Sequence, residues 1–141
     1  MIGFVGLGSI GSKIATRVAT QLKTPIKIFD LNPSAVSSLS SDLLQPASSA
    51  DDLITNSQII LTCLPKTHMV ASTLSSSTHL SNKTIIDISS GDPFEAQSLA
   101  THLLATHSAT FIDCPVSGGP TGAAAGALTA MVSGDESTYN D

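Results

Sequence analysis

Positive charge is scarce in this sequence. Its 141 residues include 6 Lys and Arg against 11 Asp and Glu, which gives a formal net charge of −5. A nucleic-acid-binding protein needs a basic surface to meet the phosphate backbone, so the composition argues against nucleic-acid partners. Only 12% of the residues are charged whereas 41% are hydrophobic, which is the wrong balance for a disordered chain. We therefore expect a globular protein.

Cysteine and aromatic residues are also few. Cys63 and Cys114 are too few and too unpatterned for a disulfide scaffold or a metal site, and each ends an apolar run, as a buried small hydrophobic residue would. Trp is absent, with 4 Phe and 1 Tyr, so an aromatic-rich binding surface is not expected. The chain instead carries 22 Ser and 15 Thr, a composition that fits an enzyme of closely packed aliphatic strands and helices.

Long hydrophobic runs are missing as well. No apolar run approaches the roughly 18–20 residues of a transmembrane helix, so we expect no membrane partner. Met1 leads directly into a strand-like run and then glycines, which is not the pattern of a signal peptide, and an arginine-rich transit sequence is absent. We expect a cytoplasmic protein, or a mitochondrial one if a targeting segment precedes these residues.

Short β-rich runs alternate with stretches of helix length, which predicts an α/β fold. We expect a single Rossmann-type domain with a doubly wound, mainly parallel sheet. Side-chain caps predict where helices begin, at Asn32 with Pro33, at Ser49 or Ala50, and at Asp92. The predicted strands are 2–6, 25–30, 43–46, 58–64, 84–88, 109–114 and 127–133. The predicted helices are 8–22, one opening at 32, 49–55, 66–77, 93–107 and one beginning at 135–137.

A glycine motif follows the first predicted strand and opens the first predicted helix, which is the context of a dinucleotide-binding turn. Gly6 permits the tight turn, Gly8 lets the backbone approach a pyrophosphate, and Gly11 lets the helix pack closely on the strand. The pyrophosphate would lie on free N–H groups at the positive end of the helix. The alternative is a glycine-rich turn without a ligand. The candidate cofactor-binding residues here are Gly6, Leu7, Gly8, Ser9, Ile10 and Gly11.

Asp30 ends the second predicted strand, 19 residues after Gly11. A carboxylate about 20 residues beyond the motif is expected to hydrogen-bond the adenosine ribose. It also repels a 2′-phosphate, and the neighbouring Leu31 is not the arginine that would pair with one. The sequence thus favours NAD over NADP, unless Asp30 is simply an acidic residue before a helix.

The four histidines show no pattern of a catalytic triad or a metal site. We interpret His79, His102 and His107 as solvated side chains. His68 and Lys66 lie just after Pro65, and either could contact a cofactor if that loop lines its site.

Further motifs extend as far as residue 136. They occur in the order GFVGLGSIGSKIA (3–15), LP (64–65), DISS (87–90), DCPVSGG (113–119), GALT (126–129) and GDE (134–136). Together they resemble the β-hydroxyacid dehydrogenase family, which includes 3-hydroxyisobutyrate dehydrogenase, 6-phosphogluconate dehydrogenase and small semialdehyde reductases. The resemblance implies an oxidoreductase that transfers hydride between NAD and a small β-hydroxyacid or semialdehyde.

The resemblance also implies roles for particular residues. Leu64 and Pro65 would pass beneath the cofactor at the carboxyl end of their strand. Ser90 stands where the family has a threonine near the nicotinamide ribose, and it keeps the hydroxyl group. A serine hydroxyl and the closely spaced N–H groups of a Gly-Gly turn suit a substrate carboxylate. The family's substrate-binding turn is matched by Ser117, Gly118 and Gly119.

The catalytic group of the family lies outside the residues that match. In the family a lysine of a second, all-helical domain donates and accepts the proton, and none of the 5 lysines here matches it. We expect residues 1–141 to be a dinucleotide-binding domain, incomplete near its C-terminal end and without that catalytic domain. Two hypotheses stay open: the chain is part of a longer NAD-dependent dehydrogenase, whose family members are expected to be homo-oligomers, or it is an inactive dinucleotide-binding module.

Overall fold

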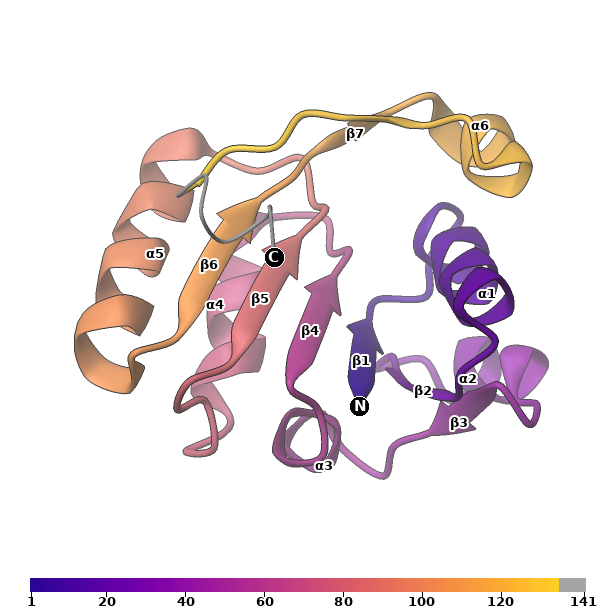
Figure 1. Ribbon diagram of the computed structural model, residues 1–141, viewed down its shortest axis with the longest axis horizontal. Coiled ribbons are helices and arrows are strands. Elements are labelled where there is room, and N and C mark those ends of the chain that lie inside the picture. Colours follow the sequence, from indigo (N-terminus) through magenta and orange to yellow (C-terminus); the bar gives the residue numbers. More distant parts are fainter. Residues whose placement is uncertain (135–141) are drawn as a thin grey trace.

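The computed structural model describes residues 1–134, and the helix predicted to begin at 135–137 lies outside them. Six strands form one parallel sheet, and two short strands form a separate antiparallel pair (Figure 1). The strands are β1 (Ile2–Val5), β2 (Ile26–Phe29), β3 (Leu44–Pro46), β4 (Ile59–Thr62), β5 (Thr84–Asp87), β6 (Thr110–Asp113), β7 (Val116–Ser117) and β8 (Thr129–Ala130). The helices are α1 (Gly11–Leu22), α2 (Pro33–Leu39), α3 (Ala50–Thr55), α4 (Thr67–Ser75), α5 (Pro93–His107) and α6 (Gly119–Ala125).

The order of the strands reverses between β1 and β4. The chain winds outward from β1 through β2 to β3, then crosses back so that β4 pairs with the other side of β1, in the order β3-β2-β1-β4-β5-β6. Open sheets of this doubly wound kind bind ligands at the carboxyl ends of the strands, beside the reversal point. The predicted Rossmann-type α/β fold is confirmed, and a ligand site is expected beside the reversal point.

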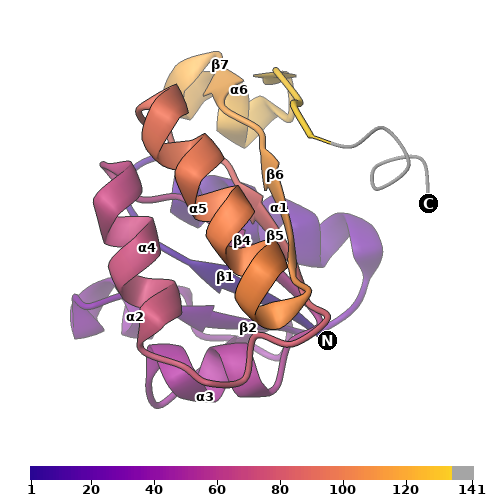
Figure 2. The ribbon, with the colours of Figure 1, turned by 90° about the vertical axis from the view of Figure 1, so that its left-hand side faces the viewer.

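Helices cover both faces of the sheet (Figure 2). On one face α1 and α2 bury a cluster that includes Phe4, Ala15 and Ile28. On the other face α3, α4 and α5 bury a second cluster around Leu53 and Leu74. Strands buried on both faces need continuous apolar runs, which is why the strands of this chain could be recognised in the sequence. No helix within residues 1–134 has the length and apolarity needed to cross a membrane.

Three helices begin at the capping residues that the sequence predicts. Asn32 caps α2, Ser49 caps α3 and Asp92 caps α5, each through a side-chain oxygen that accepts a backbone N–H of the first turn. The helix predicted for 8–22 begins later, at Gly11, because residues 8–10 form the turn of the glycine motif.

The strand predicted for 127–133 is present but much shorter than predicted. Only the two residues of β8 are a strand, and they pair antiparallel with β7 outside the main sheet. Ser133 returns to the main sheet through a single bridge to Asp113 at the end of β6. The apolar residues of this segment are mostly exposed, so no buried face extends the strand.

Part of the stretch rich in Gly, Pro and Ala forms a helix, α6, which the sequence analysis does not predict. It lies against α1 (Figure 1), where the Arg17 guanidinium donates to the Ala124 carbonyl oxygen at 3.5 Å. Gly126 ends α6 at φ 68°, and a Cβ atom there would overlap the Arg17 side chain. The helix therefore depends on a contact with residues more than 100 positions away, which the local pattern does not encode.

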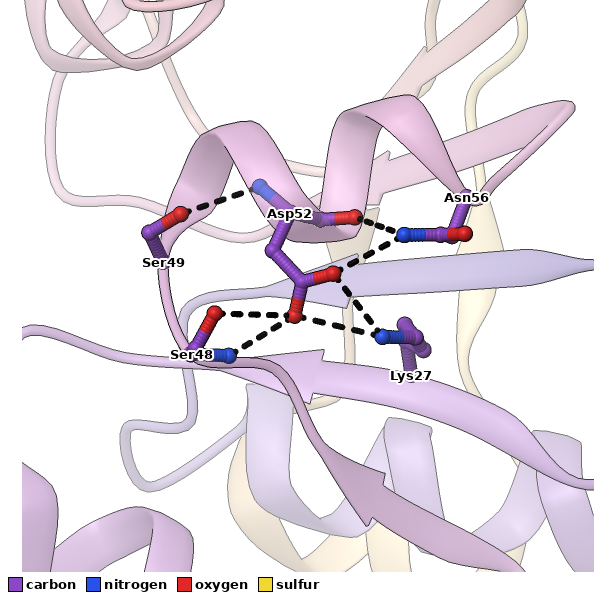
Figure 3. A network of polar contacts seen from close by, with 5 residues as sticks. All are labelled: Lys27, Ser48, Ser49, Asp52 and Asn56. Atoms are coloured by element: carbon purple, nitrogen blue, oxygen red, sulfur yellow. Dashed lines mark hydrogen bonds and ion pairs between the residues drawn. The ribbon is translucent and has the colours of Figure 1, made fainter.

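A carboxylate on α3 ties that helix to β2 and to the preceding loop (Figure 3). Asp52 accepts hydrogen bonds from Lys27 Nζ at 3.1 and 3.2 Å, from the Ser48 N–H at 2.9 Å and from Asn56 Nδ2 at 2.8 Å. The backbone N–H of Ser48, followed by the hydrogen bond from Lys27, holds the pKa of Asp52 below its usual value. The ionised carboxylate is therefore the form that stabilises this corner of the fold.

We expect Asp52→Asn to lower the free energy of unfolding at pH 7 by about 1 kcal/mol, because solvent screens this partly exposed ion pair. The folded-state pKa is lowered, so the stabilisation is complete above the unfolded pKa and is lost as the pH falls through the folded pKa. The wild-type and variant values from urea unfolding should stay apart above about pH 4 and converge as the pH falls further below it. Asp51→Asn, in the same helical turn, is the control. A difference in unfolding free energy between the wild type and Asp52→Asn that does not change with pH would contradict the prediction.

Candidate functional site

A cleft of about 870 Å³ opens where the strand order reverses. It is bounded by the loops that follow β1, β2, β4 and β5 and by one side of α4. The sequence-predicted residues that line it are Gly6, Gly8, Ser9, Ile10, Gly11, Asp30, Leu64, Pro65 and Ser90. The fold thus brings together nearly all the predicted cofactor-binding residues from four separate loops.

The three glycines of the turn serve different purposes. Gly6 has φ 95°, and a Cβ atom there would overlap the Cys63 carbonyl oxygen. A Cβ atom at Gly11 would overlap the Gly6 carbonyl oxygen, because α1 begins directly against the end of β1. At Gly8 a Cβ atom would meet nothing within 4 Å. The fold therefore requires Gly6 and Gly11, whereas Gly8 leaves a cradle open for a group that approaches the backbone.

The beginning of α1 suits an anion. Its N-cap residue, Ile10, provides no side-chain cap, and the Ser12 and Lys13 N–H groups already donate to the carbonyl oxygens of Gly8 and Ile10. Of the first turn, the Gly11 N–H is the one that donates to no carbonyl oxygen within residues 1–134 and is left for a ligand. Lys13 Nζ donates to the Ser9 carbonyl oxygen at 3.1 Å, which places a cation beside the same turn. A positive helix end with a lysine attracts phosphate groups, so the residues present fit the pyrophosphate of a dinucleotide.

Asp30 faces the cleft and also braces the glycine turn. Its Oδ2 accepts the Leu7 N–H at 2.7 Å, and its Oδ1 accepts the Asn32 N–H at 2.8 Å. The Leu7 side chain is 4% exposed and packs in the core, so this residue contributes only its backbone to the site. Leu31 lines the cleft beside Asp30 and is 85% exposed.

A buried network of hydrogen bonds, not predicted from the sequence, joins the loops after β4 and β5. Asp87 Oδ1 accepts the Thr62 hydroxyl at 2.8 Å and the Ser89 N–H at 3.0 Å. Ser89 Oγ in turn accepts the Leu64 N–H at 2.9 Å. The network fixes the Leu64 turn relative to Ser89, and both residues line the cleft.

The negative charge of Asp87 also helps to raise the pKa values of three nearby groups, Cys63, Asp113 and Cys114. Burial, followed by the charge of Asp87, raises the pKa of the Cys63 thiol and the pKa of the Asp113 carboxyl group. Burial and the charges of Asp113 and Asp87 raise the pKa of the Cys114 thiol. Both cysteines are free and half-buried, and Cys63 lines the cleft, so the interpretation as a buried hydrophobic residue is incomplete for it.

One side of α4 lines the cleft and is mostly missed in the sequence. Of the two residues singled out near Pro65, His68 lines the cleft, whereas Lys66 is not among the lining residues. The signal that could have found this side is the helical spacing of polar residues in a segment rich in Ser and Thr. The further residues along the cleft are Met69, Ser72 and Thr73 of α4 and its C-cap residue, Ser76.

The predicted substrate turn lies beside the cleft rather than in it. Val116 lines the cleft, but the next three residues do not. Gly118 and Gly119 have φ 131° and 61°, so this turn uses conformations that favour glycine. Within residues 1–134, no three His, Cys, Asp or Glu side chains are grouped as metal ligands.

Comparison with known proteins also indicates a dinucleotide-binding domain. Residues 1–141 match the family model of the NAD binding domain of 6-phosphogluconate dehydrogenase. The chain belongs to this family. The resemblance drawn from the sequence motifs is therefore confirmed over the whole of the chain.

Relatives of this 6-phosphogluconate dehydrogenase-type domain include 3-hydroxyisobutyrate dehydrogenases. The mitochondrial enzyme of Drosophila melanogaster is 34% identical over 142 residues, which cover 99% of this chain and 43% of that protein. The structure of Mycobacterium tuberculosis 3-hydroxyisobutyrate dehydrogenase with L-serine superimposes with a TM-score of 0.91 at 28% identity, covering 99% of this chain and 48% of the other.

A third similar structure is Psf3 in complex with NADP⁺ and 2-OPP, with a TM-score of 0.87 at 26% identity, covering 99% of this chain and 51% of that one. This chain thus spans about half the length of the proteins it matches. It is an NAD(P)-binding domain of the 3-hydroxyisobutyrate dehydrogenase type.

Proposed function

We propose that this chain binds NAD and forms the cofactor-binding part of a dehydrogenase that transfers hydride between NAD and a small β-hydroxyacid. The observation that carries the proposal is Asp30, a carboxylate at the end of β2 that lines the cleft and is bonded to the glycine turn. It suits the ribose hydroxyls of NAD and repels a 2′-phosphate. Leu31 beside it offers no positive charge. A related structure contains NADP⁺, so this choice rests on Asp30 and Leu31.

The proposed roles follow the length of the cleft. The turn from Gly6 to Gly11 holds the pyrophosphate, and the bound nicotinamide supplies the hydride chemistry. Leu64, Pro65 and Ser90, at the ends of β4 and β5, support the nicotinamide half. The turn at 117–119, which lies beside the cleft, takes the substrate carboxylate. A small β-hydroxyacid is supported by the M. tuberculosis relative, whose structure includes L-serine, a carboxylic acid with a hydroxyl group on its β carbon.

We place the proton-transferring group outside residues 1–141, as the family resemblance implies. General acid–base catalysis supplies about 10²–10⁴-fold of rate. Residues 1–141 tested by themselves should therefore bind the cofactor and turn over a hydroxyacid poorly. The two free cysteines suit a reducing compartment, and we propose the cytoplasm or the mitochondrial matrix.

Thermal unfolding with and without NAD tests the proposal. NAD at about 100 times its Kd should raise Tm by about 5 °C or more. Asp30→Ala should remove most of this shift, because it deletes the ribose acceptor and the hydrogen bond to the Leu7 N–H. Asp42→Ala, at an exposed carboxylate away from the cleft, is the matched control and should keep the shift. A folded wild-type chain with no shift at millimolar NAD would overturn the proposal.

A further inference from the structure

The two ends of the cleft differ in the residues they offer. Asp30 and the glycine turn occupy the side of β1 and β2, and the proposed function assigns the adenosine and pyrophosphate to that side. The rest of the lining lies along one side of α4 and at the ends of β4 and β5, where it includes Leu64, Ser89 and Ser90. The proposed function assigns the nicotinamide half to the β4–β5 end.

A fixed negative charge lies directly behind this β4–β5 end. Asp87 is 2% exposed, and the hydrogen bonds from Thr62 and Ser89 hold its carboxylate in place. Asp113 is its register partner on β6, so a second carboxylate follows the next strand. The only ion pair within residues 1–134 joins Lys27 to Asp52, so neither of these carboxylates is paired with a cation there.

The negative charge of Asp87 acts on residues that line the cleft. Ser89, whose N–H donates to the Asp87 carboxylate at 3.0 Å, lines the cleft, so the charge lies directly behind a surface that a ligand would touch. In keeping with this, Asp87 contributes, after burial, to the raised pKa of the Cys63 thiol, another lining residue. Such a field acts differently on the two forms of the cofactor. The oxidised nicotinamide ring carries one positive charge, and addition of a hydride makes it neutral. The adenosine and pyrophosphate are the same in both forms.

We infer that Asp87 makes the cleft select the oxidised cofactor over the reduced one. The inference rests on the proposed function, because it needs the nicotinamide ring at the β4–β5 end. A fixed carboxylate in a wall with little water attracts the positively charged ring and loses this attraction when the ring becomes neutral. Asp87 thus favours the bound state in which the cofactor is ready to accept hydride.

Titration calorimetry with NAD⁺, NADH and ADP-ribose tests the inference. Asp87→Asn removes the charge and keeps an oxygen that accepts hydrogen bonds. It should raise the Kd for NAD⁺ about fivefold relative to the Kd for NADH. ADP-ribose lacks the nicotinamide, so its Kd should not change. Thr62→Val is the matched control, because it removes a hydrogen bond to the same carboxylate but keeps the charge. It should change the two Kd values by the same factor.

Equal weakening of NAD⁺ and NADH binding by Asp87→Asn would overturn the inference and leave Asp87 with a purely structural role. If that variant does not fold, Asp113→Asn provides the second test. The Asp113 side chain accepts no hydrogen bond within residues 1–134, and its loss should move the ratio in the same direction by about twofold. An unchanged ratio there would also count against the inference. A wild-type chain that binds neither ADP-ribose nor NAD⁺ would overturn the proposed function as well.

Discussion

Replacing Gly8 with alanine should weaken NAD binding in a chain that remains folded. A Cβ atom at this position meets no protein atom within 4 Å, so the free energy of unfolding should change by less than about 0.5 kcal/mol. The added methyl group would occupy the cradle where we propose that the pyrophosphate approaches the backbone. We expect the Kd for NAD to rise at least about tenfold, as measured by titration calorimetry.

Gly11→Ala is the matched control, since the same methyl group is added only three residues away. There it would overlap the Gly6 carbonyl oxygen and crowd the Cys63 side chain, so α1 must move away from β1. Overpacking of this kind lowers the free energy of unfolding by about 1–3 kcal/mol or more. Urea unfolding should therefore separate the two variants. Normal NAD affinity in Gly8→Ala would mean that the pyrophosphate does not lie at residue 8.

The parts of the site that were predicted from the sequence are those that depend on nearby residues. The glycine turn needs only a strand before it and a helix after it, and both could be recognised from their apolar patterns. Asp30 could be found because its distance from Gly11 along the chain is characteristic of the motif. Leu7 shows the limit of such a motif. It belongs to the turn, yet its side chain is buried and only its N–H is used.

The parts that could not be predicted depend on long-range packing. The Ser and Thr residues of α4 weaken the helix prediction, but Thr73 and Ser75 bond back to carbonyl oxygens four residues earlier and the helix persists. Only the packed fold shows which side of α4 faces the cleft. Likewise, α6 is held by Arg17, and the network around Asp87 appears only when β4 and β5 are paired.

Coenzyme choice should be reversible by two substitutions at the end of β2. Asp30→Asn removes the charge that repels a 2′-phosphate and keeps one oxygen for the Leu7 N–H. The variant loses the hydrogen bond from the Asn32 N–H, but this N–H is exposed and can donate to water instead. Leu31→Arg adds a guanidinium at a position that is 85% exposed, where the longer side chain displaces nothing from the core.

Together, Asp30→Asn and Leu31→Arg should shift the ratio of the NADP and NAD dissociation constants about 100-fold or more toward NADP. Loss of repulsion and a charge-assisted pair with the phosphate each contribute roughly tenfold. Leu31→Ala removes the same side chain without adding charge and should leave the ratio within about twofold. Because neither side chain is part of the core, Tm without ligand should stay near that of the wild type. A double variant that is folded but still prefers NAD would show that Asp30 does not lie at the adenosine ribose.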